Sequence, residues 1–201
     1  MKMSSLDRML LLVTGLLAAY QIAIGVDGLD VFTISAHTIA FGVLLVAGLL
    51  MLILGFSVLD SPVVVIVSTA IPLSLSLGLV SELLASYRTL YLLFVLVGFA
   101  AVIVTRSFLM PGKLPTIVLA IVHGVAGMII FLLPIVFAIN GQARPGFALV
   151  GVGGALIGMG GLLLSFLKVG KPILSRETIF RVMPGLLLLM TACFVAGFKF
   201  G

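Results

Sequence analysis

The run from Val31 to Phe56 contains 26 residues and no Asp, Glu, Lys or Arg. A helix crosses the roughly 30 Å hydrocarbon core of a bilayer in about 20 residues, so this run is long enough to span a membrane. The whole chain is 63% hydrophobic and 8% charged over 201 residues, which leaves too little polar surface to cover a water-soluble globule. We therefore predict an all-α polytopic integral membrane protein, multi-pass in the cell membrane and surrounded by the lipid bilayer.

Short polar segments divide the chain into seven apolar runs. The predicted helices form a single transmembrane domain over residues 1–201 and lie at 9–26, 31–56, 63–84, 89–105, 114–139, 146–167 and 179–198. The first run follows Lys2 and Arg8, as the apolar core of a signal peptide does, but it continues to Val26 without a convincing small-residue cleavage site. We expect this first helix to be retained.

Two of the runs resemble each other at a fixed offset. His37 falls on His123 and Gly48 falls on Pro134 when the chain is shifted by 86 residues. Shifts of 83 and 89 residues align the runs that follow. The repeat units would be 31–105 and 117–198, and each has an odd number of crossings, so the second unit would enter the membrane from the opposite face. The sequence thus predicts a 3+3 inverted repeat preceded by one additional N-terminal helix.

The basic residues predict the orientation. The formal net charge is +5, and the Lys and Arg residues lie mostly in short segments between apolar runs, where they act as topology signals and not as a nucleic-acid surface. Eight are predicted on the side of the N-terminus: Lys2, Arg8, Arg106, Lys113, Lys168, Lys171, Arg176 and Arg181. Three are predicted on the other side: Arg88, Arg144 and Lys199. Since cytoplasmic loops carry the excess of positive charge, we expect a cytoplasmic N-terminus and a C-terminus outside.

The run 63–84 carries several hydroxyl groups around a central proline. Its candidate polar or ligand-contact residues are Ser68, Thr69, Ser74 and Ser76. Pro72 removes one backbone hydrogen bond, and nearby hydroxyl groups are a usual way to satisfy the freed carbonyl in lipid. A kinked helix packed against its neighbours explains this pattern, and so does a polar lining for a substrate path. Gly48, Pro72 and Pro134 are the positions at which a helix is expected to break.

The run 146–167 is rich in glycine. Its candidate helix-packing residues are Gly151, Gly154, Gly158 and Gly161. Gly154 and Gly158 form a small-xxx-small step, which lets a second backbone approach closely and is a main source of helix association in lipid. We expect this helix at an interface, either within one chain or between subunits of a homo-oligomer or of a complex with other membrane proteins.

The two histidines are the candidates for chemistry, because a neutral imidazole can bind metal or haem iron, relay a proton or bond a neighbouring helix. A bis-histidine haem needs its two coordinating nitrogens roughly 4 Å apart, since metal to nitrogen bonds are about 2 Å. The positions of His37 and His123 in oppositely directed helices separate them by roughly 15 Å along the membrane normal. Interhelical hydrogen bonding is therefore the favoured interpretation and separate functional roles are the next. No cofactor or metal is predicted, and haem b is the remaining alternative.

No catalytic constellation is visible in the sequence, which has no metal-spaced cluster of His, Asp and Glu, no nucleophile motif and no phosphate-binding loop. Its single cysteine excludes an intrachain disulfide. No carboxylate lies firmly in the middle of an apolar run, which disfavours an ion-driven carrier. The favoured function is a non-enzymatic, helix-packing subunit of a larger membrane complex. The alternatives are a small permease or channel for an uncharged or weakly polar solute, and a b-type haem-binding subunit that uses His37 and His123.

Overall fold

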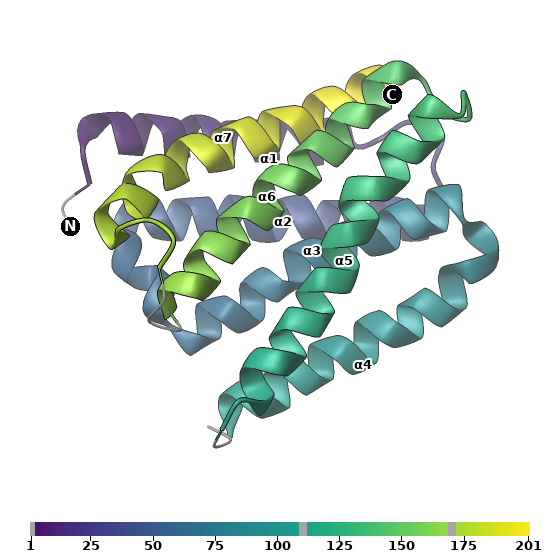
Figure 1. The fold of residues 1–201 in the computed structure, drawn as a ribbon. Helices are drawn as coiled ribbons and strands as arrows, with labels where there is room; N and C mark the ends of the chain where they lie inside the picture. The colour runs from purple at the N-terminus through teal and green to yellow at the C-terminus, as the bar shows by residue number, and fades with distance from the viewer. Residues whose placement is uncertain (1–2, 109–111, 169–171) are drawn as a thin grey trace.

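A computed structural model describes residues 3–108, 112–168 and 172–201. Over these ranges the chain forms seven α-helices joined by short turns (Figure 1). The helices are α1 (Ser5–Ile24), α2 (Val31–Leu54), α3 (Pro62–Leu83), α4 (Arg88–Ser107), α5 (Leu114–Ile139), α6 (Ala148–Lys168) and α7 (Arg176–Phe200). The 3-10 turns are η1 (Phe56–Asp60), η2 (Ala85–Tyr87) and η3 (Pro145–Phe147). All seven helices are long and apolar enough to cross a membrane, which confirms the all-α prediction and indicates a multi-pass membrane protein.

Polar caps lie outside the apolar runs, so hydropathy alone misplaces some helix ends. At the start of α1, Asp7 N donates to Ser4 Oγ at 3.1 Å and Ser4 N donates to Asp7 Oδ2 at 2.8 Å. This capping box starts α1 four residues before the predicted position 9. Ser175 Oγ accepts from Thr178 N at 3.1 Å, so α7 also begins before its predicted start at 179.

The helices do not break at the three positions where a break was expected. α2 continues through Gly48, α3 through Pro72 and α5 through Pro134. All three residues are buried among neighbouring helices. A helix end at such a position would leave several backbone groups without partners, whereas a proline inside a helix removes one hydrogen bond. No helix therefore ends at these three candidate positions.

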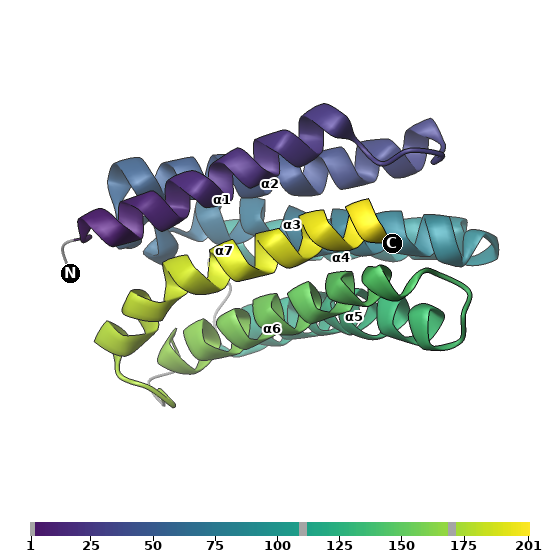
Figure 2. The same ribbon diagram turned by 90° about the horizontal axis from the view of Figure 1, so that it is seen from above.

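The helices form a layered bundle with α3 near its centre. Consecutive helices pack side by side, and α7 returns to contact α1. Figure 2 shows α7 between the pair α1 and α2 and the pair α5 and α6. α3 contacts α2, α4 and α5, and eleven consecutive residues of α3, 71–81, are buried. A helix that is buried on every face must be surrounded, so α3 is the helix on which the others pack.

The largest buried cluster joins α3 to helices on both sides of it. Leu75 and Leu79 lie in this cluster with Phe41 of α2, Ile130 of α5 and Phe194 of α7. The rings of Phe41 and Phe194 meet edge to face with their centroids 6.4 Å apart. Such contacts stabilise the bundle by close packing, since lipid is as apolar as the core itself. The core therefore fixes the position of α3 relative to α2, α5 and α7.

Candidate functional site

His37 lies in a tightly packed position near the start of α2, and its exposed fraction is 3%. One edge of the ring lies against the backbone of Gly78 on α3, where an added Cβ would be 2.5 Å from His37 Cδ2 and closer still to Nε2. The Phe198 ring of α7 lies beside it, with the two ring centroids 4.7 Å apart. Gly78 therefore makes room for the imidazole, because any side chain there would displace the ring.

The interhelical hydrogen bonds expected of the two histidines are not found among the described residues. Both ring nitrogens of His37 are buried and have no partner there, because the ring packs on a glycine backbone and a phenylalanine. The Nδ1 atom of His123 lies 3.1 Å from Leu119 O, which belongs to its own helix. The His37 ring is thus held by packing alone, whereas the His123 ring is held by a hydrogen bond within its own helix.

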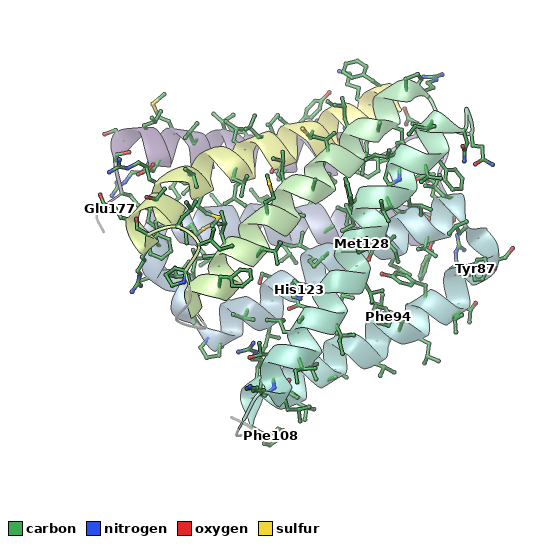
Figure 3. The ribbon with its side chains drawn as sticks, viewed as in Figure 1. Tyr87, Phe94, Phe108, His123, Met128 and Glu177 are labelled. Carbon is green, nitrogen blue, oxygen red and sulfur yellow. The ribbon has the colours of Figure 1, made fainter. Side chains whose placement is uncertain are left out.

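His37 and His123 do not share a site. His123 lies on α5 (Figure 3), and α3 packs against both α2 and α5. Along the described residues α2 and α5 make no extended contact of their own. His37 packs against α3 and α7, whereas His123 bonds within α5. The contacts of the two histidines therefore involve different helices.

Other polar side chains gather at the same end of the bundle as His37. Gln21 lies in the last turn of α1, and Ser81 and Glu82 lie in the last turn of α3, beside the first turns of α2. Gln21 Oε1, Ser81 Oγ and Glu82 Oε2 are buried and have no hydrogen-bond partner in the part of the chain that the structure describes. Buried polar atoms normally have partners, because an unpaired one costs about 1–3 kcal/mol. Most of the buried polar atoms that have no partner among the described residues therefore lie at this end of the bundle.

An ion pair covers the same end at its surface. Arg88, the first residue of α4, pairs with Asp30, the N-cap of α2, and Arg88 Nη2 lies 3.3 Å from Thr33 Oγ1. The guanidinium also lies 5.1 Å from the centre of the Phe32 ring. Hydrogen bonds from the side chain and backbone of Thr33, together with the Arg88 guanidinium, hold the pKa of Asp30 below its usual value. The ionised carboxylate therefore joins α2 to α4 at neutral pH.

Gln21, Asp30 and Arg88 were not predicted as site residues. Asp30 carried one usable signal, because an Asp directly before an apolar run is a strong N-cap candidate. Nothing in the sequence indicated that Arg88, 58 positions later, would be its partner.

The hydroxyl groups of α3 do not form one site. Four of them donate to carbonyls of their own helix: Ser68, Thr69, Ser74 and Ser76. A hydroxyl that bonds a carbonyl three or four residues earlier needs no other partner in lipid. Tyr91 of α4 donates to Ser76 Oγ at 2.9 Å and so joins α4 to α3. These bonds support a packed helix more than a polar path.

Glycines let α6 approach both of its neighbours. An added Cβ at Gly151 would lie 2.5 Å from Phe131 O of α5, and one at Gly154 would lie 2.9 Å from Phe131 N. On another face, added Cβ atoms at Gly153 and Gly160 would meet side chains of α7 at 2.6 and 2.7 Å. A larger residue at Gly151, Gly153 or Gly154 would also meet backbone atoms and push the helices apart, whereas at Gly160 it would meet only side chains, which can move.

Gly158 and Gly161 face open space instead. No other described atom lies within 4 Å of a Cβ added at either residue, and the same holds for Gly124 and Gly127 of α5. Figure 1 shows that α5 and α6 lie close together near the η3 turn and diverge toward their other ends. Within the chain, the small-xxx-small step therefore makes its contact at Gly154 and not at Gly158.

A surface hollow of about 690 Å³ lies at the opposite end of the bundle, beside residues 54–57 and the first turn of α7. Its charged side chains already have partners in the chain. Arg181 Nη2 donates to Glu177 Oε1 at 2.9 Å, and the Arg176 guanidinium lies 5.2 Å from the centre of the Phe180 ring. We assign no ligand to this hollow.

No family model, no curated protein and no solved structure matches this chain. Any function must therefore be inferred from the geometry of the chain itself. Two features bear on function. The first is the set of unpaired polar atoms around His37. The second is the set of glycines on α5 and α6 that face open space, which we call the uncovered glycines: Gly124, Gly127, Gly158 and Gly161.

Proposed function

We propose that the protein is a non-enzymatic subunit of a larger membrane assembly, and that a transmembrane helix of another polypeptide packs between the diverging parts of α5 and α6. The observation that carries this proposal is the set of uncovered glycines Gly124, Gly127, Gly158 and Gly161. A second copy of this chain or a different membrane protein can supply the helix.

The uncovered glycines lie on the faces that α5 and α6 turn toward each other. Gly158 and Gly161 come seven residues after Gly151 and Gly154, which contact α5. Residues seven apart are two helical turns apart, so all four share one face of α6. The two uncovered glycines of α5 lie four and seven residues before Phe131, which α6 contacts. Since the two helices are antiparallel, the four glycines lie at similar depths in the membrane.

Glycine has an energetic cost at such positions. Inside a helix it is roughly 0.5–1 kcal/mol less favourable than alanine, so four uncovered glycines cost about 2–4 kcal/mol together. Lipid chains gain little from a small residue, whereas a second helix gains close backbone packing. Packing against another helix offsets this cost, and contact with lipid does not.

Leucine at Gly158 or Gly161 tests this proposal. Each variant should fold, because the new side chain enters open space, but the assembly seen by gel filtration in detergent should shift to the monomer. Gly42→Leu on α2 is the matched control, since Gly42 also has no other described atom within 4 Å of an added Cβ and lies on a different helix. A monomeric wild-type protein, or variants that assemble as the wild type does, would contradict the proposal.

We also propose that the N-terminus is cytoplasmic. The distribution of eight Lys and Arg residues against three supports this orientation, and two of the eight, Lys2 and Lys171, lie outside the described residues. A reporter fused after Gly201 is expected to be active only outside the cytoplasm. Reporter activity inside the cell would mean that the orientation is reversed.

A small permease or channel is the second candidate. It is favoured by the open space beside Gly124, Gly127, Gly158 and Gly161, which lies between α5 and α6, helices that belong to the second unit of the predicted inverted repeat. One feature opposes it: α3 contacts α5, but α6 and α2 make no matching extended contact among the described residues. Glycerol entry into proteoliposomes that contain the protein tests this candidate. Entry no faster than into protein-free vesicles would exclude a glycerol pathway.

A further inference from the structure

A small cavity lies between α1 and α2, next to His37. Its volume is about 10 Å³. Three of the residues that line it carry polar side chains, namely Gln21, His37 and Thr38, and apolar side chains and Gly25 complete the wall.

Gln21 and His37 bring unpaired polar atoms to this cavity. Each residue is 3% exposed. Gln21 Nε2 donates to Gly25 O at 2.7 Å, which leaves Oε1 as a buried acceptor without a partner among the described residues. The reversed amide would place two oxygen atoms in contact, so this orientation is the favourable one. A neutral His37 ring offers one donor and one acceptor, and neither ring nitrogen has a partner in the described chain.

The volume of the cavity decides what it can hold. One water molecule needs roughly 10–15 Å³ by this measure, and a buried water makes about three hydrogen bonds. The cavity of about 10 Å³ therefore has room for one water molecule. Gln21 and His37 supply two polar partners, and the hydroxyl of Thr38 can supply the third.

We propose that Gln21 and His37 bind a single internal water molecule in this cavity. The water donates to Gln21 Oε1 and makes its second hydrogen bond with a ring nitrogen of His37. It joins the last turns of α1 to α2 at the end of the bundle where Asp30 and Arg88 join α2 to α4. The water thereby satisfies two side chains that have no other partner for these atoms among the described residues.

Nuclear magnetic resonance can observe this water directly. The chain has two histidines, so ¹⁵N-histidine labelling of a His123→Gln variant in lipid nanodiscs leaves His37 as the one histidine signal. We expect magnetisation transfer from water protons to the His37 ring, and loss of that transfer in Gln21→Leu, whose side chain fills the cavity. Thr14→Val is the matched control on α1, because the buried Thr14 hydroxyl donates to Leu10 O of its own helix at 2.8 Å. This control should retain the transfer.

Two results overturn the proposal. The first is the absence of magnetisation transfer from water protons to the His37 ring in the His123→Gln protein, which retains Gln21. This measurement does not depend on whether a Gln21 variant folds. The second is transfer of full intensity in a folded Gln21→Leu protein, because water would then reach His37 from another direction. Comparison of the wild-type spectrum with that of His37→Gln assigns the His37 signal independently of the His123 variant.

Discussion

Gly154→Leu is expected to separate α6 from α5 and to lower the stability of the bundle strongly. The Cβ atom alone would lie 2.8 Å from Ile130 Cγ2 and 2.9 Å from Phe131 N. A side chain can rotate away, but the backbone of α5 can yield only if the two helices move apart. Overpacking of a filled contact typically costs about 1–3 kcal/mol, and the rest of the leucine side chain must be accommodated as well. Thermal unfolding in detergent, followed by circular dichroism, measures the loss.

Gly158→Leu is the matched control, one turn further along the same face of α6. Its side chain enters open space within the chain, so the unfolding temperature of the monomeric variant should stay close to that of the monomeric wild type. Equal losses for Gly154→Leu and Gly158→Leu would mean that α5 and α6 do not diverge as Figure 1 shows. If only Gly158→Leu lowered the unfolding temperature, the close contact between α5 and α6 would be at Gly158 and not at Gly154.

The second large effect is expected at Gly78, where even alanine is too large. A Cβ atom there would be 2.5 Å from His37 Cδ2, and the Phe198 ring on the neighbouring helix α7 limits where the imidazole can move. We expect Gly78→Ala to destabilise the protein by about 1–3 kcal/mol. A stability unchanged from the wild type would show that the imidazole moves aside freely.

A double-mutant cycle separates this contact from a general effect of alanine in α3. His37→Ala removes the ring and leaves space for the new Cβ, so Gly78→Ala should be better tolerated in that background. Contacting residues typically show coupling of about 0.5–3 kcal/mol. Thermal unfolding of the four proteins gives the coupling energy, and strictly additive losses would contradict the contact between His37 and Gly78.

The seven helices could be predicted because each apolar run is as long as a bilayer is thick. Their ends were less certain, since caps such as Ser4 and Ser175 lie outside the runs on which hydropathy depends. No helix ends at Gly48, Pro72 or Pro134, the candidate break positions, for a different reason. Propensity acts on one residue, whereas burial among neighbouring helices favours a continuous helix, which loses one backbone hydrogen bond at a proline, over a helix end, which leaves several backbone groups unpaired.

The faces of α6 could not be predicted from glycine content. Its glycines contact α5, contact α7 or face open space: Gly151, Gly153, Gly154, Gly158, Gly160 and Gly161. Gly151, Gly154, Gly158 and Gly161 share one face of the helix and Gly153 and Gly160 lie on another, but this spacing does not tell which glycines meet a neighbour and which face open space. That assignment depends on where α5 and α7 lie and on how far α5 diverges from α6.

The polar end of the bundle was also hidden in the sequence. The alignment gives His37 and His123 equivalent positions in the predicted repeat, but the two side chains have different surroundings in the structure. Gln21 is one polar residue within an apolar run, and its importance depends on the cavity that α2 forms beside it. Such a site arises from tertiary packing and has no local sequence signal.

A photo-crosslinking amino acid at Leu162 tests most directly whether another polypeptide packs between α5 and α6. Leu162 is 59% exposed and lies one turn after Gly158 on α6. Leu16, which is 61% exposed, is the matched control because it belongs to α1, and Figure 2 shows α1 and α6 on opposite sides of α7. In native membranes, irradiation is predicted to join position 162 to a polypeptide of another chain and position 16 to lipid. Crosslinks from position 162 to lipid alone, or to α5 of the same chain, would contradict the account.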